Sequence, residues 1–243
     1  MNTAFYTAST GVIYLQKSMD ITANNLANAE TPGFKTSVPS FSSLLYTNIH
    51  RGADEMTNGL KVGHGVKLSG TTVQMVQGQM MPTDRELDFA IEGEGFFAVE
   101  NQLGERYYTR AGNFLVKLED EDAYLVTTTG DYVLGPDEER VQLNAEGETQ
   151  PNLTNMQARI GIYTFPNKYA LIQEGANRFS ATELAGEPEL GGGHKLTQGF
   201  LETSNTEMSK EMVDIIVTQR AFQFSARVVQ VADELESIVN NLR

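Results

Sequence analysis

Residues 204–243 read SNTEMSKEMVDIIVTQRAFQFSARVVQVADELESIVNNLR, and this sequence predicts one long, uninterrupted helix. Ser204 and Glu207 have the spacing of a capping box, which marks the expected start. No Gly or Pro follows, and a helix from Glu207 to Arg243 would be about 55 Å long. Side chains recur at the alternating steps of four and three that are typical of a coiled coil. These positions are Met208, Met212, Ile215, Gln219, Phe222, Ala226 and Val229, continued after a slip in phase by Ala232, Leu235, Val239 and Leu242.

The opening residues of the chain predict a second helix with the same spacing. It is expected to end near Asn28, because Pro32 and Gly33 follow in the pattern of a type II turn. Periodicity alone leaves open whether the two helices pack within one chain or between subunits. The residues at the coiled-coil spacing are Phe5, Ala8, Val12, Leu15, Met19, Thr22 and Leu26.

Between the helices the sequence predicts a β domain. Residues 36–80 have no clear period and many Gly residues, which predicts an extended linker with short strands. Short apolar or alternating runs separated by turn residues then predict strands at 87–91, 96–100, 106–109, 114–117, 124–127, 132–134, 159–164 and 170–173. We therefore expect an α+β fold. Its long terminal helices, in segments 1–35 and 200–243, would form a coiled-coil-like inner domain, with a central all-β domain at 81–199.

Composition and charge exclude several functions. The chain has 243 residues, no Cys and a net charge of −14. Residues 1–34 contain one base and two acids, and residues 204–243 contain four bases and six acids, so the middle carries most of the charge. Nearly neutral helices can crowd together without strong repulsion. The chain has no basic patch, so nucleic acid is not expected as a partner.

The sequence also lacks the features of membrane and secretory segments. It has no run of eighteen apolar residues, and residues 1–9 lack the basic and apolar regions of a secretory signal. We therefore expect no transmembrane segment and no cleaved signal peptide.

Neither the histidines nor the acidic run at 119–122 favours a metal site. His50, His64 and His194 are far apart, and none has a ligand-spaced His or Cys nearby. The acidic run lacks the ligand spacing of a calcium loop and is expected to be a solvated loop tip.

Three carboxylates before the strand at 96–100 form a candidate catalytic cluster. Asp88, Glu92 and Glu94 could in principle serve as acid and base. However, Gly93 and Gly95 favour a joint between strands where backbones approach closely. We therefore expect no catalytic residues and no cofactor.

Residues 23–35 read ANNLANAETPGFK. This segment resembles the N-terminal signature of the flagellar axial proteins of bacteria, the family of rod, hook and hook-associated proteins. The short chain favours a basal-body rod protein over the longer hook protein. Ser225 and the acidic run depart from the common pattern and leave proximal and distal rod open. The other similar segments are 91–97 (IEGEGFF), 108–114 (YTRAGNF), 199–205 (GFLETSN), 211–213 (EMV) and 219–222 (QRAF).

The resemblance implies a structural subunit that polymerises into the drive shaft of the flagellum and transmits torque. It implies a helical homo-oligomer, contact with other flagellar rod and hook proteins, and passage through the flagellar type III export apparatus without a cleaved signal. Because the helices have no partner before assembly, the ends of the isolated protein are expected to be disordered or weakly helical. The residues expected at assembly contacts are Phe5, Val12, Leu15, Met19, Asn24, Asn25, Leu26, Asn28, Pro32, Gly33, Phe34, Met212, Ile215, Gln219, Arg220, Phe222, Val229 and Leu235.

Two other classes of function stay open at this point. One is a hook-associated or scaffold protein without enzymatic activity that self-associates through its terminal helices. The other is a carbohydrate-active or peptidoglycan enzyme, for which Asp88, Glu92 and Glu94 would be the first residues to substitute.

Overall fold

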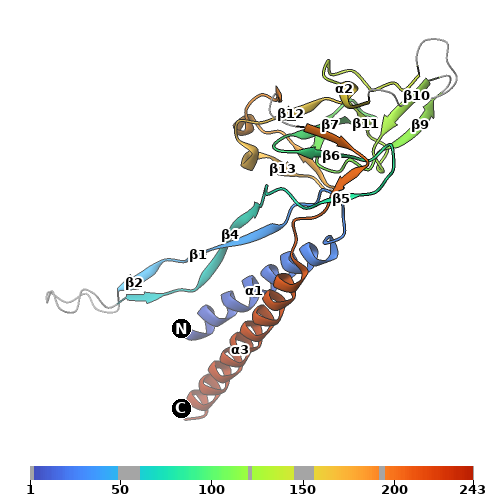
Figure 1. The fold of residues 1–243 in the computed structure, drawn as a ribbon. Coiled ribbons are helices and arrows are strands. Elements are labelled where there is room, and N and C mark those ends of the chain that lie inside the picture. The colour runs from blue at the N-terminus through green and yellow to red at the C-terminus, as the bar shows by residue number, and fades with distance from the viewer. Residues whose placement is uncertain (1–2, 49–60, 120–121, 145–155, 192–194, 243) are drawn as a thin grey trace. The chain divides into compact units, whose positions relative to one another are not determined.

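The computed structural model describes residues 3–48, 61–119, 122–144, 156–191 and 195–242 (Figure 1). They divide into two compact units, each assembled from separate stretches of the chain. Unit 1 consists of Met1–Ala27, Ser37–Gln74 and Glu207–Arg243, and unit 2 of Asn28–Thr36 and Met75–Thr206. The terminal helices therefore share their unit with residues 37–74, which the sequence predicted as a linker.

Unit 1 contains an antiparallel pair of helices, α1 (Thr3–Ala27) and α3 (Met208–Asn241). Near the end of α1, Asn25 Nδ2 lies 3.3 Å from Glu211 Oε2. A Cβ atom added to Gly11, further back in α1, would lie 3.5 Å from Ser225 Oγ, further along α3. These two contacts show that α1 and α3 run in opposite directions. The helix–β–helix order expected from the sequence is confirmed, and the end of α1 lies one residue from its expected position.

The capping box predicted at Ser204 is wrong, because α3 begins at Met208 with Glu207 as its N-terminal flanking residue. Glu207 makes no capping hydrogen bond through its side chain. Instead, Ser204 Oγ accepts a hydrogen bond from the N–H of Thr206 at 3.1 Å. A local turn of this kind competes with helix formation and delays the first helical residue.

The less exposed residues of each helix include much of the predicted stripe and also residues beside it. In α1 the buried residues are Ser18, Thr22 and Asn25. In α3 the predicted positions Met212 and Gln219 are exposed. In α3 the predicted positions Ile215, Phe222, Ala226, Val229 and Ala232 are half-buried or buried. The other half-buried or buried residues of α3 are Glu211, Thr218, Ala221 and Ser225.

A two-stranded ribbon completes unit 1. β1 (Ser37–Ser43) pairs with β4 (Val66–Val73), with an irregular register between Ser40 and Phe41. Beyond them β2 (Tyr46–Asn48) pairs with β3 (Lys61–Gly63). The segment predicted as a linker with short strands is thus largely paired. Within the described residues, no helix is both long and apolar enough to cross a membrane.

Unit 2 is built on an antiparallel sheet of nine described strands in the order β13-β14-β8-β7-β11-β10-β9, with β12 pairing with β7 and β15 with β12. Two smaller pairs, β16–β6 and β17–β5, also lie in this unit. The strands are β5 (Met80–Pro82), β6 (Phe89–Glu92), β7 (Phe96–Glu100), β8 (Arg106–Thr109), β9 (Leu115–Glu119), β10 (Asp122–Val126), β11 (Tyr132–Val133), β12 (Ile162–Thr164), β13 (Ile172–Gln173), β14 (Arg178–Ser180), β15 (Glu189–Leu190), β16 (Lys195–Gln198) and β17 (Phe200–Glu202). Short helices are α2 (Met156–Arg159), η1 (Lys168–Ala170) and η2 (Glu183–Ala185).

The core of unit 2 lies against the central strand β7. The ring of Phe97 packs edge-on against that of Phe114, with centroids 5.1 Å apart, and Phe89 packs against Phe114 at 6.2 Å. Each ring is fully buried, which contributes about 1.5–3 kcal/mol. A Cβ atom on Gly112 would lie 1.8 Å from the backbone oxygen of Phe89, so this close approach requires glycine. The other buried core residues are Ile91, Val99, Ala123, Leu125, Val133, Val141, Leu143, Met156, Ile160, Ile162 and Leu196.

Most predicted strands are observed, some with different ends. Strands β7 and β8 have the predicted limits. The strand predicted at 159–164 is wrong in its first half, because α2 buries Met156 and ends at Arg159. The strand predicted at 170–173 begins only at Ile172, after the helical turn η1. Short apolar runs do not separate a strand from a buried helical turn.

Candidate functional site

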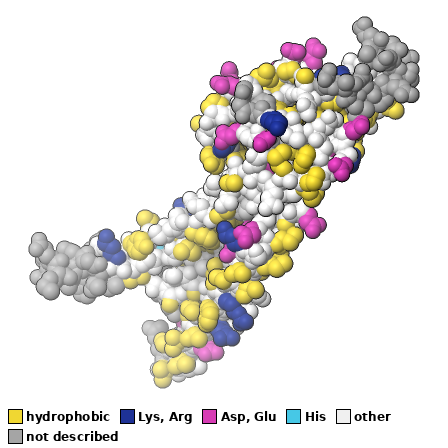
Figure 2. Space-filling model, in the orientation of Figure 1, with side chains coloured by type: hydrophobic (Ala, Val, Ile, Leu, Met, Phe, Trp, Pro, Cys, Tyr) yellow, Lys and Arg dark blue, Asp and Glu magenta, His cyan; other side chains and the backbone are white. Residues whose placement is uncertain are grey.

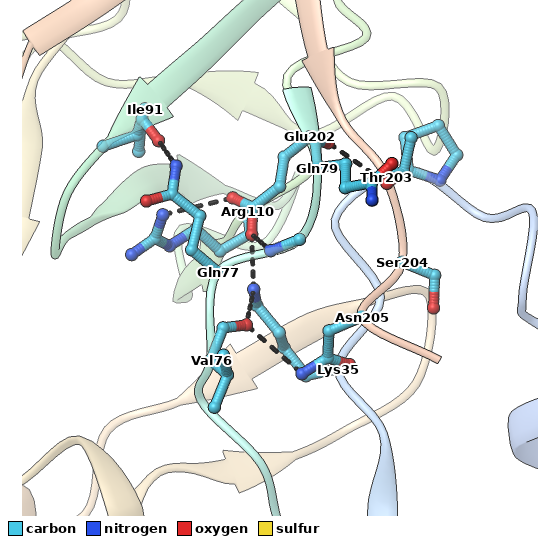
Figure 3. A network of polar contacts seen from close by, with 12 residues as sticks. Lys35, Val76, Gln77, Gln79, Ile91, Arg110, Glu202, Thr203, Ser204 and Asn205 are labelled. Atoms are coloured by element: carbon cyan, nitrogen blue, oxygen red, sulfur yellow. Dashed lines mark hydrogen bonds and ion pairs between the residues drawn. The ribbon is translucent and has the colours of Figure 1, made fainter. Parts of the chain in front are cut away.

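The buried carboxylate of Glu202 is contacted by residues of unit 2 that lie far apart in the sequence (Figure 3). Lys35 Nζ lies 2.5 Å from Oε1, and the backbone N–H of Gly78 donates to the same oxygen at 2.9 Å. Arg110 Nη1 donates to Oε2 at 3.1 Å. The side chains of Glu202, Lys35 and Arg110 are 1%, 2% and 7% exposed. We call Lys35, Gly78, Arg110 and Glu202 the Glu202 network.

Local backbone geometry places Lys35 in this network. Thr31, Pro32 and Gly33 form the predicted type II turn, in which Phe34 N donates to Thr31 O and Gly33 has a φ of 69°. Gly33 N also donates to the backbone oxygen of Glu202 at 2.7 Å. A Cβ atom on Gly33 would lie 2.5 Å from the backbone carbon of Arg110, so the turn requires glycine for its conformation and for its packing.

The Glu202 network and its neighbours join three segments of unit 2 that are adjacent in sequence to residues of unit 1. Thr36 donates through its N–H and its Oγ1 to Asn205 Oδ1, at 2.8 and 2.9 Å. Val76 O accepts from Lys35 Nζ at 2.7 Å and from Asn205 Nδ2 at 3.2 Å. Segments 28–36, 75–79 and 202–206 are therefore fastened to one another.

Burial opposes the charge on both cations of the network. It lowers the pKa of Lys35 and the pKa of Arg110, and in each case Glu202 raises the pKa in part. A buried ion pair of this kind contributes little net stability compared with an apolar replacement, but loss of one partner leaves an unpaired buried charge. The arrangement therefore specifies which segments meet.

A second polar contact point lies in unit 1, at Asn25. Its Nδ2 donates to Ser37 O at 2.8 Å, and Ser37 N donates to its Oδ1 at 3.0 Å. The same Nδ2 contacts Glu211. The amide of Asn25 thus joins the end of α1, the start of β1 and the start of α3 within one chain.

The structure gives the other expected assembly residues different surroundings. Gly33 and Phe34 are buried in unit 2. In unit 1, Asn24, Met212, Gln219, Arg220 and Leu235 are exposed, and the remaining helical residues of the set, Phe5, Val12, Leu15, Met19, Leu26, Ile215, Phe222 and Val229, are half-buried. Asn28 and Pro32, in unit 2, are also half-buried.

A second apolar stripe on α3 faces solvent in unit 1, and only Leu235 and Leu242 of it belong to the stripe predicted from the sequence. It consists of Val217, Phe224, Val228, Val231, Leu235, Ile238 and Leu242, all exposed. From Phe224 onward these residues recur at steps of four and three, as in a coiled coil. Figure 2 shows hydrophobic side chains on the surface over the helices. As far as Val231, its signal in the sequence was a second heptad pattern, two residues out of phase with the first.

The carboxylates considered for catalysis each have a different basic neighbour. Buried Asp88 Oδ1 lies 3.5 Å from Arg85 Nη1. Exposed Glu92 and Glu94 pair with Lys195 at 3.9 Å and Lys168 at 2.6 Å.

No metal-binding cluster of three His, Cys, Asp or Glu residues occurs in the described part of the chain. His64 Nε2 lies 2.9 Å from Thr47 Oγ1, whereas His50 and His194 lie outside the described residues. The expected loop tip also lies largely outside them, between the paired residues Glu119 and Asp122.

Comparison with known proteins matches three parts of the chain. The family described as "Flagella basal body rod protein" matches residues 5–35. "Flagellar hook protein FlgE/F/G D1 domain" matches residues 90–162, and "Flagellar basal body rod FlgEFG protein C-terminal" matches residues 197–242. The flagellar basal-body rod protein FlgG of Borreliella burgdorferi is 35% identical, over 100% of this chain and 99% of its own. The chain belongs to the flagellar basal-body rod protein family.

Other rod-family relatives agree over nearly their full length. FlgG of Bacillus subtilis is 32% identical over 98% of each chain. The flagellar hook-basal body complex protein FlhP of the same bacterium is 30% identical, also over 98% of each chain. The predicted membership of the rod and hook family is confirmed, and with it the prediction of a structural rod protein.

The Glu202 network has one charged residue in each of the three matched ranges of the rod family. Lys35 lies in 5–35, Arg110 in 90–162 and Glu202 in 197–242. Sequence reasoning did not identify this network, although all three residues lie in the segments that carry the resemblance. Arg110 and Glu202 are the only charged residues of segments 108–114 and 199–205, whereas Lys35 ends segment 23–35, which also contains Glu30.

Proposed function

We propose that this chain is a structural subunit of the flagellar basal-body rod, that it polymerises through its terminal helices, and that the polymer transmits torque. The observation that carries the proposal is the exposed stripe on α3. A helix that is apolar on two faces needs a second partner, and α1 covers only the face that contains Ile215, Phe222 and Val229. We propose that helices of neighbouring subunits cover the other face in a coiled-coil-like inner layer.

The Glu202 network suits a part that carries mechanical load. Glu202 fastens the segments that lead to α1, to the ribbon and to α3, so a force applied to one segment is shared by the others. Polar contacts of this kind are directional, so they favour one arrangement of the chain. Apolar packing is not directional and specifies an arrangement less strictly.

Partners and location follow from the same proposal. We propose contacts with other rod and hook proteins, a place in the flagellar basal body, and export through the flagellar type III apparatus without a cleaved signal. We also propose that the protein is not an enzyme. Asp88, Glu92 and Glu94 each have their own basic neighbour, which supports a structural role for these carboxylates.

A hook-associated or scaffold protein that self-associates through its helices is the alternative, and the relation to FlhP keeps it under consideration. Concentration-dependent assembly of the purified chain separates the two. Growth into extended helical polymers, seen by electron microscopy, is expected of a rod subunit. A closed dimer that never elongates would support the scaffold.

A further inference from the structure

The second apolar stripe on α3 has a row of charged residues along one flank. Arg220, Arg227 and Glu234 are exposed and follow one another at steps of seven, close to two helical turns, so they lie in line. Arg227 directly precedes Val228 of the stripe, and Glu234 directly precedes Leu235. In coiled coils, charged residues in this position determine which partner helix binds and in which direction.

The other flank of the stripe is uncharged, and part of it packs against α1. Its residues, Thr218, Ser225, Ala232 and Val239, also recur at steps of seven. Ser225 lies beside α1, because a Cβ atom added to Gly11 would come within 3.5 Å of its Oγ. A parallel second copy of α3 would set the charged flank of one helix against the uncharged flank of the other and gain no ion pair. An antiparallel copy, related by a two-fold axis, sets the charged flank against itself.

Overlap of the apolar residues fixes the register of an antiparallel pair. The stripe extends from Val217 to Leu242, which is about 38 Å along the helix. Complete overlap therefore places Val217 of one copy opposite Leu242 of the other. Half-buried Ala221 then lies opposite Ile238, which matches a small side chain with a large one. Every residue of the stripe has an apolar residue opposite it, in the pairs Val217–Leu242, Ala221–Ile238, Phe224–Leu235 and Val228–Val231.

The charged flank favours the same register. With complete overlap, Arg227 of each copy lies beside Glu234 of the other, and two-fold symmetry forms this ion pair twice. Arg220 then lies beside Asn241, whose amide oxygen can accept a hydrogen bond from the guanidinium group.

Other registers match the charges less well. A shift of seven residues in one direction would place Glu234 of one copy beside Glu234 of the other. A shift in the opposite direction would pair Arg220 with Glu234, but it would set Arg227 beside Arg227 and place Ile238 opposite Asp214. Apolar overlap and charge complementarity therefore select one arrangement.

From these observations we propose that α3 binds α3 of a second copy of this chain in antiparallel orientation, through the second apolar stripe, and forms a two-fold symmetric dimer before assembly. The stripe is exposed in the single chain, and the dimer removes it from water. The proposed function gives the same stripe to neighbouring subunits of the polymer. The dimer therefore competes with polymerisation and limits premature growth. This competition rests on the proposed function, whereas the dimer itself does not.

Charge reversal in the full chain tests the dimer at concentrations too low for polymers to form. Arg227→Glu and Glu234→Arg each replace two ion pairs by two contacts between like charges. We expect each variant alone to raise the dissociation constant of the dimer about tenfold, measured by sedimentation equilibrium. An equimolar mixture of the two variants restores opposite charges, so it should form a mixed dimer as tight as that of the wild type.

Asp233→Arg is the matched control, because it changes the net charge as Glu234→Arg does. Asp233 is exposed and lies on the side of α3 opposite the stripe, so its replacement should leave the dissociation constant unchanged. A wild-type chain that remains monomeric until it polymerises would overturn the proposal. A mixture that binds no more tightly than either charge-reversed variant alone would overturn it as well.

Disulfide cross-linking tests the direction of the two helices. The chain contains no Cys, so Val228→Cys and Val231→Cys each introduce a single thiol. In the antiparallel dimer these two positions lie opposite each other. Oxidation of an equimolar mixture should therefore link the two variants to each other faster than either variant to itself. Faster linkage within each variant is expected of a parallel pair and would contradict the proposal.

The linked dimer also tests the competition with polymerisation. It should not elongate under conditions in which the reduced protein forms polymers seen by electron microscopy, and reduction should restore growth. Elongation of the linked dimer at the rate of the reduced protein would contradict the competition. Polymers that form without any dimer would overturn this inference alone, whereas dimers that never elongate after reduction would count against the proposed function alone.

Discussion

Lys35 Nζ lies 2.5 Å from Glu202 Oε1, although 167 residues separate the two in the chain. Both side chains are almost fully excluded from solvent. This contact joins the segment after α1 to the segment before α3, and Arg110 ties both to the β-sheet of unit 2.

Replacing Glu202 by Ala should lower the free energy of unfolding by about 3–5 kcal/mol, because Lys35 and Arg110 would remain buried without their counter-charge. Chemical denaturation of both proteins measures the difference. Glu92→Ala is the control, since it breaks an exposed ion pair and should cost less than about 1 kcal/mol. Equal losses in the two variants would show that the Glu202 network does not hold unit 2 together.

The network should also make stability depend on pH through Lys35. Burial lowers the pKa of this lysine below its ordinary value of 10.5. Between the folded pKa and 10.5 the unfolded chain binds a proton that the folded chain has lost, so the free energy of unfolding should rise with pH. We expect a more positive slope in this window for the wild type than for Lys35→Met, while Lys195→Met keeps the wild-type slope. A more negative slope for the wild type would contradict the lowered pKa.

Gly33→Ala should destabilise the protein more than Gly104→Ala. Both glycines have positive φ values, so both substitutions carry a conformational cost of about 1–2 kcal/mol. Only at Gly33 would the new Cβ collide with the backbone of Arg110, whereas no atom lies within 4 Å at Gly104 among the described neighbours. Thermal unfolding of the two variants compares them, and a larger loss at Gly104 would refute the close approach of the turn to Arg110.

Ile238→Glu should block polymerisation and leave the folded subunit intact, because Ile238 is an exposed residue of the second apolar stripe on α3. Leu118→Glu is the matched control, since Leu118 is an exposed apolar residue on β9 in unit 2. Sedimentation and circular dichroism measure assembly and folding. If the Ile238→Glu protein forms polymers of normal length, the second apolar stripe is not part of the assembly surface.

Hydrogen exchange on the dilute monomer tests how far the helix pair is ordered before assembly. The faces between α1 and α3 contain small and polar residues, and α3 leaves an apolar stripe in water, so we expect weak protection of both helices and a gain on polymerisation. Strong protection of α1 and α3 in the monomer would contradict this prediction.

Features set by neighbouring residues were predictable from the sequence. The end of α1 follows from Pro32 and Gly33, and the limits of β7 and β8 follow from apolar runs between turn residues. The less exposed face of α3 was predicted only in part, because α3 is apolar on two sides and periodicity alone fits either. The start of α3 was misjudged because Ser204 bonds within its own turn.

The Glu202 network depended on information that a single sequence does not contain. Lys35, Arg110 and Glu202 meet only after strand pairing brings residues more than ninety positions apart together. A charged residue in a short motif does not say which distant residue its partner is.

Microscopy of basal bodies purified from cells that lack this protein tests the central claim most directly. A structural rod subunit that polymerises through its helices predicts a shaft that stops before the rod is complete, restored by the wild-type chain and not by Ile238→Glu. Complete rods and normal filaments on motile cells would contradict the account.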